Sequence, residues 1–493
     1  MNFLIKKTLG ILLLILLLWS SCKDDSERIT EIDPALLTTQ PFDINNINDT
    51  YASIASFFFY KQWGPYNLHD PSVIKDGEWF YCYSTDVAYG LSPKIGIMVR
   101  RSKDLVNWEF VGWAIEGLPK MGVDYITSQG GTPTQGLWAP YIMKVGSEYR
   151  LYYSLAPTSG RTSCIGLLTS SSPEGPWTEK GLAVTSENSG PGTNAIDPSV
   201  VVTPSGEHWM VYGSSWDGLF ELQINPQTGL ALHTGDKGRR IARRGSTGGL
   251  ANGNLEAPEI IYNSQTNLYY LFVAYDWLST KYNVRVFRSA NPNGPFLDWN
   301  GINVDNTEDN GPMIVAPYQF IGHGGWAGVG HCSVFQNDGQ YYMAHQGRPG
   351  VDRGFMVMHV RKIFWTPDGW PIVSPERYAN VPDETVSTDE IAGSYEQIVL
   401  GYATVPGYEA EQSDPQYNLA YSTILGSDGK INNDPNNTWA YDAPWLELRW
   451  NNGQFVDKLH VSRERDWENK KASTIVMTGL NGGGLAIWLK KVE

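Results

Sequence analysis

The stretch His69-Asp70-Pro71-Ser72-Val73-Ile74, followed by Trp79-Phe80-Tyr81-Cys82-Tyr83, decides the fold predicted for this chain. A short apolar strand, a polar turn at Gly77 and an aromatic-rich strand together predict a β-hairpin. The pattern recurs four times, at Ala139-Pro140-Tyr141-Ile142, Ile196-Asp197-Pro198-Ser199-Val200, Glu256-Ala257-Pro258-Glu259-Ile260 and Gly330-His331-Cys332-Ser333-Val334. The aligned positions 71, 140, 198, 258 and 332 are 69, 58, 60 and 74 residues apart.

A second motif repeats with the same period. Trp108 and Trp177 end related turn segments and lie 69 residues apart, which is also the spacing of the first two aligned prolines. Units of roughly 60–70 residues with about four strands are typical of propeller blades. We therefore predict an all-β chain with a five-bladed β-propeller over residues 57–385; a β-sandwich is the alternative. Residues 386–493 lack the repeat but keep short strand-like runs between Gly/Asn turns, which predicts a smaller all-β domain, either a barrel or a sandwich.

Composition narrows the classes of function. The 493 residues include 52 acidic and 37 basic side chains, a formal charge of −15. An acidic surface repels phosphates, so nucleic acid is not an expected partner and a neutral ligand is favoured over a polyanion. The apolar and aromatic content is too high for a disordered chain. We expect the protein to act as a monomer.

The first residues are predicted to be a targeting signal. Lys6 and Lys7 precede an apolar run, Leu9–Trp19, that is short for a membrane span and fits the core of a signal peptide. The following Ser20-Ser21-Cys22 resembles a bacterial lipoprotein signal, although an ordinary secretory signal is the alternative. We expect a signal peptide at 1–21 and a lipidated Cys22 with a tether and lead-in over 22–56. The protein would be secreted through the inner membrane and anchored by lipid alone at the outer membrane, exposed on the cell surface.

The repeat has a chemical consequence. The innermost strands of a propeller start at the same end of its channel, so equivalent positions ring the axis. This position holds Asp70, Asp197 and His331 in three blades and Ala139 in another, while Glu256 comes one residue earlier in its blade. Crowded carboxylates raise each other's pKa, so a structural role does not call for them. One carboxylate acting as base on water and a second, protonated one acting as acid would hydrolyse a glycosidic bond.

At these residues the sequence resembles family 43 of the glycoside hydrolases, and within it the endo-α-1,5-L-arabinanases. The resemblance covers about residues 65 to 380. It implies that Asp70 is the general base, Glu256 the general acid, and Asp197 the residue that tunes the pKa of the acid and orients it. The segment around His331 resembles the one whose histidine holds a calcium ion in the central channel, mostly through waters. An inverting mechanism then predicts an Asp70–Glu256 carboxyl separation of roughly 6.5–9.5 Å.

The same resemblance implies a neutral plant polysaccharide, arabinan, and its oligosaccharides as substrate. The residues expected to bind it are His69, Trp138, Asn194, Ser214 and Trp216. Trp326 is a further candidate for stacking on sugar, and Arg348 is either a pocket residue or a residue of the surface rim. One departure is Tyr141, where the family often has Asp, so one sugar subsite is in doubt.

Other functions remain open from sequence alone. An exo-acting α-L-arabinofuranosidase or β-xylosidase of the same family shares these motifs. Five-bladed fructan hydrolases instead carry Asn-Asp-Pro-Asn and Arg-Asp-Pro segments, which differ from His69-Asp70-Pro71-Ser72 and Ile196-Asp197-Pro198. A non-catalytic surface lipoprotein that only binds glycan would tolerate loss of the acids, and all three are present. The C-terminal domain could bind sugar or only support the propeller.

Overall fold

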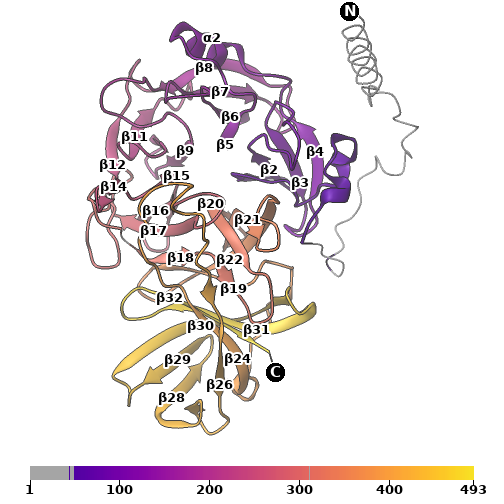
Figure 1. Cartoon of the computed structure of the whole chain (residues 1–493), viewed down its shortest axis with the longest axis vertical. Coiled ribbons are helices and arrows are strands. Elements are labelled where there is room, and N and C mark those ends of the chain that lie inside the picture. The colour runs from indigo at the N-terminus through magenta and orange to yellow at the C-terminus, as the bar shows by residue number, and fades with distance from the viewer. Residues whose placement is uncertain (1–43, 45–48, 310, 493) are drawn as a thin grey trace, which may run out of the picture. The chain divides into compact units, whose positions relative to one another are not determined.

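The structure is a computed structural model that describes residues 44, 49–309 and 311–492. Five antiparallel sheets follow one another along the chain, and Figure 1 shows them arranged around a common centre. Blade one is β1 (Ser72–Asp76), β2 (Trp79–Ser84), β3 (Met98–Ser102) and β4 (Glu109–Trp113). Blade two is β5 (Trp138–Val145), β6 (Glu148–Leu155), β7 (Cys164–Ser170) and β8 (Thr178–Thr185). Blade three is β9 (Ser199–Val202), β10 (His208–Tyr212), β11 (Leu219–Ile224) and β12 (Arg239–Ala242).

The last two blades complete the ring. Blade four is β15 (Leu255–Asn263), β16 (Leu268–Tyr275), β17 (Asn283–Ser289) and β18 (Met313–Val315). Blade five is β20 (Trp326–Asn337), β21 (Gln340–Pro349), β22 (Val357–Trp365) and β23 (Pro371–Val373), extended by β19 (Tyr318–Gln319) and β25 (Asn418–Leu419) beside β20. The innermost strands contact one another in the closed order β1, β5, β9, β15, β20 and back to β1. The predicted five-bladed propeller is therefore confirmed.

Tight hairpins and short local elements connect these strands. The turn between β20 and β21 is Asp338-Gly339, and both residues have positive φ, as a two-residue type I′ hairpin requires. The remaining elements are the hairpin β13 (Ser246–Thr247) and β14 (Leu250–Ala251), the 3₁₀ helices η2 (Ala52–Ile54) and η3 (Phe57–Gln62), and the α-helices α2 (Lys120–Ser128) and α3 (Thr388–Ile391).

Each blade is tied to the next by the residue that follows the aligned proline position. The side-chain oxygen of this residue makes a hydrogen bond to a backbone group of the next blade. The backbone group belongs to the residue two places after the aligned position of that next blade. The bonds are Ile142 N to Ser72 Oγ (3.1 Å), Tyr141 OH to Val200 O (2.8 Å), Ile260 N to Ser199 Oγ (3.2 Å), Val334 N to Glu259 Oε1 (3.4 Å) and Val73 N to Ser333 Oγ (3.1 Å). The serine of each Asp-Pro-Ser-Val copy thus holds the ring, and Tyr141 takes the same structural place in blade two.

The segment before β1 closes the ring on blade five. Asn67 N donates to Met356 O and Met358 N donates to Pro65 O, both at 2.8 Å. Backbone hydrogen bonds therefore join the first blade to the last without a strand exchanged between them.

The C-terminal domain is a closed barrel, which decides between the two predicted architectures. Its strands in order are β24 (Gly393–Val399), β26 (Tyr421–Leu425), β27 (Lys430–Ile431), β28 (Asp434–Asp442), β29 (Trp445–Trp450), β30 (Phe455–Asp466), β31 (Lys471–Leu480) and β32 (Ala486–Lys491). Thr478 Oγ1 donates to Val373 O, so β31 packs against the outer strand of blade five.

A buried ionic cluster joins the barrel to the end of the propeller. The ammonium of Lys490 lies 2.9 Å from Glu376, 3.1 Å from Asp466 and 2.8 Å from Glu468. These three carboxylates are the group of potential metal ligands found among the described residues. Lys490 supplies one positive charge among them, and burial raises the pKa of Glu376 well above its usual range, so the negative charge of the cluster is partly compensated within the protein.

The predicted signal peptide and the lipidated Cys22 lie outside the described residues. In the part of the chain that the structure describes, no helix combines the length and the apolar character needed to cross a membrane. Cys82, Cys164 and Cys332 are buried free thiols.

Candidate active site

The residues that start the inner strands share an unusual backbone conformation. Asp70, Asp197 and His331 have φ of 53°, 56° and 49°, in the left-handed region that non-glycine residues rarely occupy. In blade four the left-handed residue is Ala257, with φ of 54°, so Glu256 precedes the shared position by one residue. Such conformations cost about 1–3 kcal/mol each and persist where surrounding structure imposes them. The sequence repeat therefore corresponds to a repeated turn at one end of the channel.

Asp70 is held by groups from two blades. Its Oδ2 accepts a hydrogen bond from Thr85 Oγ1 at 2.6 Å and lies 2.7 Å from His69 Nδ1. Its Oδ1 lies 3.0 Å from His331 Nδ1, and its backbone N donates to Gln346 Oε1 at 3.0 Å. Burial disfavours the charged form, but the two histidines outweigh it and hold the pKa of Asp70 well below its usual range.

Glu256 has the opposite electrostatic environment. Ser214 Oγ donates to its Oε2 at 2.7 Å and Tyr282 OH donates to its Oε1 at 2.9 Å. Burial raises the pKa of Glu256, and the negative charge of Asp70 adds to this, while the two hydrogen bonds act against it. Glu256 therefore keeps its proton to higher pH than an ordinary glutamate.

Asp197 is the third carboxyl of the cluster. The backbone N of Ala257 donates to its Oδ2 at 3.1 Å, which ties Asp197 to the residue beside Glu256. Burial raises the pKa of Asp197 to about 8, and the charges of Glu256 and Asp70 add to this against the pull of His331. Asp197 and Glu256 both favour the protonated form, and their titrations are linked.

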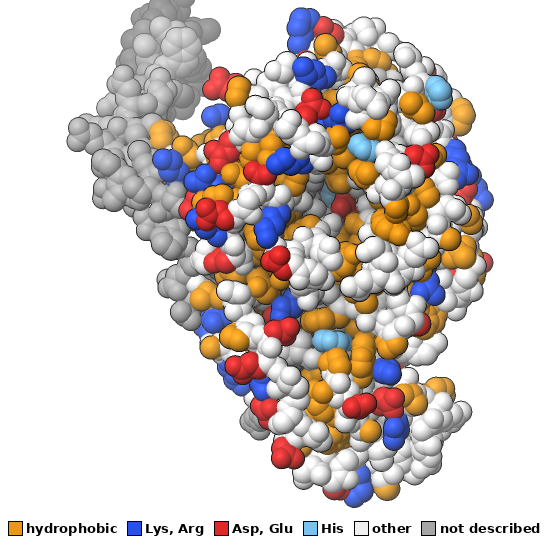
Figure 2. Space-filling model, turned by 180° about the vertical axis from the view of Figure 1, so that it is seen from behind, with side chains coloured by type: hydrophobic (Ala, Val, Ile, Leu, Met, Phe, Trp, Pro, Cys, Tyr) orange, Lys and Arg blue, Asp and Glu red, His pale blue; other side chains and the backbone are white. Residues whose placement is uncertain are grey.

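The four predicted residues thus form one cluster, because His331 lowers the pKa of all three carboxyls and the charge of Asp70 raises the pKa of Glu256 and of Asp197. Only 7–9% of Asp70, Asp197 and His331 is exposed, so the cluster meets solvent through a narrow surface. Figure 2 shows a hollow in the propeller part of the surface seen from behind, with acidic and histidine side chains inside it. A cluster of three carboxyls and one imidazole can perform acid–base chemistry on a bound neutral molecule.

His331 was also expected to hold calcium. Its Nδ1 is occupied by Asp70, and the neighbouring carboxylates raise the pKa of His331 to about 9 although burial opposes this. Among the described residues, no group of three metal-ligating side chains includes His331. Calcium prefers six to eight oxygen ligands. The residues here supply one remaining imidazole nitrogen, so they fit a calcium ion only if water provides its oxygen shell.

Several residues expected to bind substrate lie at or beside the carboxyl cluster. His69 contacts Asp70, and Ser214 contacts Glu256. Asn194 lies two residues before Ile196, and its Oδ1 accepts from Ser163 Oγ at 2.6 Å.

Two predicted tryptophans are placed by the same blades. Trp138 is half-buried at the start of β5. Trp216 is 63% exposed, with φ of 51°, two residues after Ser214, and the guanidinium of Arg161 lies 5.3 Å from its ring centre. An exposed indole close to a residue that contacts Glu256 is available to a ligand.

Trp326, a further candidate for stacking on sugar, makes no hydrogen bond or ring contact with the carboxyl cluster among the described residues. Trp326 begins β20, and its ring centre lies 4.3 Å from that of His359 and 5.0 Å from the guanidinium of Arg377. It lines a separate pocket between blade five and the barrel. Arg348, by contrast, is 7% exposed and interacts electrostatically with Asp70, so it belongs to the surroundings of the carboxyl cluster.

Sequence reasoning missed three residues that hold the acids in place. Tyr282 bonds Glu256, Thr85 bonds Asp70, and Gln346 accepts from the backbone of Asp70. None occupies the repeat position that marks the acids. Thr85 lies just after β2 and Tyr282 just before β17, where no motif distinguishes them from ordinary blade residues.

A segment of the C-terminal domain was missed as well. Residues 400–419, here called the brace segment, connect β24 to β26 and reach the loop before β17. Gln412, fully buried, accepts from Trp277 N at 2.6 Å, and its backbone O accepts from Thr280 Oγ1. Its Nε2 also donates to Asp276 Oδ1 at 3.3 Å. The brace segment therefore fixes the loop that presents Tyr282 to Glu256.

A propeller whose channel carries one ionised and one protonated carboxyl has the features of a glycoside hydrolase. Comparison with known proteins gives the family. Residues 64–371 match glycosyl hydrolases family 43, and residues 375–489 match a C-terminal lipocalin-like domain found with that family. The chain belongs to glycoside hydrolase family 43.

Similar proteins cover both parts of the chain. The extracellular endo-α-(1→5)-L-arabinanase of Thermotoga petrophila is 27% identical over 469 residues, 86% of this chain and 94% of that protein. A crystal structure of endo-1,5-α-L-arabinanase from Thermotoga petrophila superposes with a TM-score of 0.74 at 26% identity, covering 88% of this chain and 99% of the other. The extracellular exo-α-(1→5)-L-arabinofuranosidase of Cellvibrio japonicus is 30% identical over 322 residues, 62% of this chain and 86% of that protein.

Proposed function

We propose that this protein hydrolyses α-1,5-linked L-arabinofuranosyl bonds within arabinan, by a single displacement that inverts the anomeric centre. The observation that carries the proposal is the pairing of Asp70, whose pKa is held low, with Glu256, whose pKa is raised, in one cluster. An ionised base and a protonated acid are the two groups that such a reaction needs.

In the proposed reaction, Asp70 takes a proton from a water molecule, and the water oxygen bonds to the anomeric carbon. The bond from that carbon to the leaving oxygen breaks, and the leaving oxygen takes the proton of Glu256. The electron pair of the broken bond thus ends on a protonated hydroxyl, and no covalent enzyme intermediate forms. Inversion requires space for the water, so we expect the carboxyls of Asp70 and Glu256 to be roughly 6.5–9.5 Å apart.

The remaining groups of the cluster position these two. We assign to Asp197 the orientation of Glu256 through its bond to the Ala257 amide and the tuning of the pKa of the acid. Ser214 and Tyr282 fix both oxygens of Glu256. Removing the donors of a buried carboxyl changes both its direction and its pKa. We assign sugar contacts to His69, Trp138, Asn194 and Trp216.

The substrate assignment is supported by the names of the relatives, which act on α-(1→5)-linked L-arabinan or its oligosaccharides. Endo action is favoured because the relative named as an endo-arabinanase matches 86% of this chain, barrel included, whereas the relative named as exo-acting matches 62%. Sizing the products of linear arabinan separates the two: oligosaccharides of mixed length indicate endo action, and a single short product indicates exo action.

Calcium and location complete the proposal. A calcium ion would be held beside His331 mostly through water molecules, and would supply positive charge to the channel beside the acids. The two relatives quoted above are named as extracellular. We propose secretion of this chain as a monomer with a lipid anchor at Cys22 in the outer membrane.

The test of the proposed function is the Glu256→Gln variant on linear arabinan. We expect kcat to fall by roughly 10²–10⁴, the usual contribution of a general acid, with binding of arabino-oligosaccharides retained. Glu116→Gln, at an exposed glutamate outside the site, is the matched control and keeps full activity. Unchanged turnover in Glu256→Gln would exclude Glu256 as the acid, and failure of the wild-type chain to degrade arabinan would exclude the substrate.

A further inference from the structure

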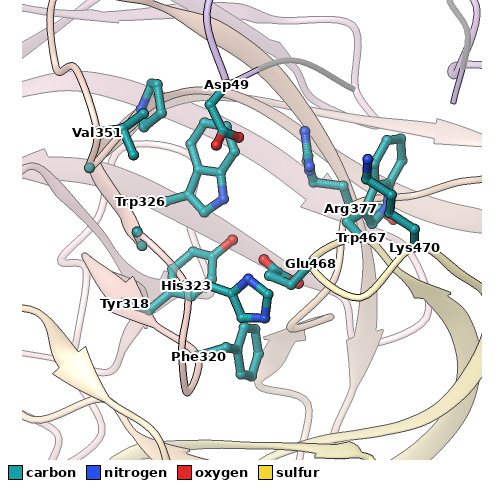
Figure 3. Close-up of a pocket in the computed structure, with 14 residues that line it drawn as sticks. Asp49, Tyr318, Phe320, His323, Trp326, Val351, Arg377, Trp467, Glu468 and Lys470 are labelled. Atoms are coloured by element: carbon teal, nitrogen blue, oxygen red, sulfur yellow. The ribbon is translucent and has the colours of Figure 1, made fainter. Parts of the chain in front are cut away.

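A cavity of about 220 Å³ lies where blade five meets the barrel (Figure 3). None of the three candidate catalytic carboxyls lines it. This interface pocket is formed by the segment before β20, the turn after β21, and the turn between β30 and β31. Its lining includes Asp49, Tyr318, Trp326, Val351, Arg377 and Trp467. It is smaller than the pockets that hold drug-sized ligands and has room for one or two small rings.

Aromatic side chains make up much of the wall. Figure 3 shows Trp326 and Tyr318 on one side of the cavity and Arg377 with Trp467 on the other. Trp326 Nε1 faces the cavity and donates no hydrogen bond to any described residue. Indoles present an apolar face together with a polar N–H, so they suit ligands that are apolar on one side and polar at the edge.

Arg377 supplies donors that no group in the described residues uses. It is 8% exposed, and its guanidinium lies 4.2 Å from the ring centre of Trp467 and 5.0 Å from that of Trp326. Within the described chain no group accepts a hydrogen bond from this guanidinium, and none of its nitrogens is closed off from solvent. A guanidinium stacked in a fixed plane is pre-organised to donate to two adjacent oxygens of a ligand.

The charge of the lining favours a neutral ligand. Arg377 and Lys470 are balanced by Asp49 and Glu468, and the chain as a whole carries −15. A polyanion would face that overall charge, and a cation would meet Arg377 and Lys470. A ligand with adjacent hydroxyl groups matches these donors and acceptors, because a hydroxyl can accept a hydrogen bond from Arg377 or Trp326 and donate one to Asp49. Adjacent hydroxyl groups are typical of a saccharide.

The pocket and the channel are connected by a strand. β20 carries both Trp326, at the pocket, and His331, in the carboxyl cluster; the strand is irregular between them, so the five-residue spacing corresponds to less than roughly 18 Å. A polymer of several sugar units is long enough to span it. We propose that the interface pocket is a second saccharide site, which holds a furanosyl unit of an arabinan chain whose other units reach the channel. The identity of the sugar as arabinan rests on the proposed function. The inference that the pocket binds a saccharide rests on the residues of the pocket alone.

The test uses the full-length chain and affinity electrophoresis in gels that contain linear arabinan. Val351 is 60% exposed at the pocket, so Val351→Arg places a long charged side chain over the cavity without removing a buried contact. We expect it to weaken retention by arabinan about tenfold, as loss of roughly two hydrogen bonds would do. Val202→Arg, at a 44% exposed valine of β9 outside the pocket, is the control and is expected to be retained as the wild type is.

The outcomes separate this proposal from the proposed function. Wild-type retention of Val351→Arg overturns the second site even if the chain degrades arabinan. Equal weakening of Val351→Arg and Val202→Arg also overturns it, since added charge alone would then explain the effect. If the chain degrades no arabinan, the substrate assignment is overturned. If the wild type is retained by xylan instead of arabinan and Val351→Arg loses that retention, the pocket is still a saccharide site, but the proposal that it binds a unit of arabinan is overturned.

Discussion

Replacing Tyr282 by Phe removes one hydrogen bond from Glu256 and should move the alkaline limb of the pH–activity profile upward. The phenol donates to Glu256 Oε1 at 2.9 Å and lowers the pKa of that carboxyl. A hydrogen bond to a charged group contributes about 1.5–3 kcal/mol. At 1.36 kcal/mol per pH unit, the pKa of Glu256 should rise by about one to two units.

The sign follows from the role of the acid. Glu256 acts in its protonated form, so activity is lost as pH rises through its pKa, and a higher pKa extends activity to higher pH. In the wild type we expect this limb above the usual range of a glutamate, because burial raises the pKa of Glu256 and its titration is coupled to that of Asp197. The acidic limb, set by Asp70, should not move.

The assay is kcat/KM on linear arabinan from about pH 5 to about pH 10. Tyr270→Phe is the matched control, because Tyr270 is buried in the same blade and donates to Gly369 O away from the carboxyls. Coincident alkaline limbs for Tyr282→Phe and wild type would refute the reasoning. An equal shift in Tyr270→Phe would refute it too, since the effect would then not pass through Glu256.

Three further predictions concern the brace segment, the ionic cluster and the proposed calcium ion. Gln412→Ala leaves the Trp277 amide without its acceptor, so the free energy of unfolding, measured in urea, should fall by about 1–3 kcal/mol, and kcat should fall as well. Glu409→Ala is the control: Glu409 is exposed in the same segment, and its replacement should change neither quantity. Lys490→Met leaves three buried carboxylates unpaired and should lower the free energy of unfolding by about 3–5 kcal/mol; an unchanged urea midpoint would contradict the cluster's role. Chelation by EDTA should lower kcat of the wild type and added calcium should restore it, while His331→Ala should respond to neither treatment.

The sequence predicted the blades because their repeat is local. A proline or cysteine position followed by a strand, a turn and an aromatic strand can be read in each unit, and the ring bonds of Ser72, Ser199 and Ser333 explain why the motif is kept. Asp70, Asp197 and His331 were located by the same register. Glu256 was found despite its offset, and the left-handed Ala257 accounts for that offset.

The residues that were missed depend on contacts between distant parts of the chain. Tyr282 reaches Glu256 across 26 residues, and Gln412 reaches Trp277 across 135, without any shared motif. The pocket that Trp326 lines could not be predicted either, because aromatic residues occur in every blade and sequence does not reveal which rings face the barrel. Closure of the barrel likewise depends on the pairing of β24 with β32, which no local pattern encodes.

The most direct test of the central claim is the anomeric configuration of the first product, followed by NMR while the enzyme degrades linear arabinan. A single displacement by Asp70 and Glu256 predicts that the new reducing end first appears with inverted configuration and then mutarotates. A first product with the configuration of the substrate would require a covalent intermediate and would contradict the assignment of Asp70 as a base acting on water.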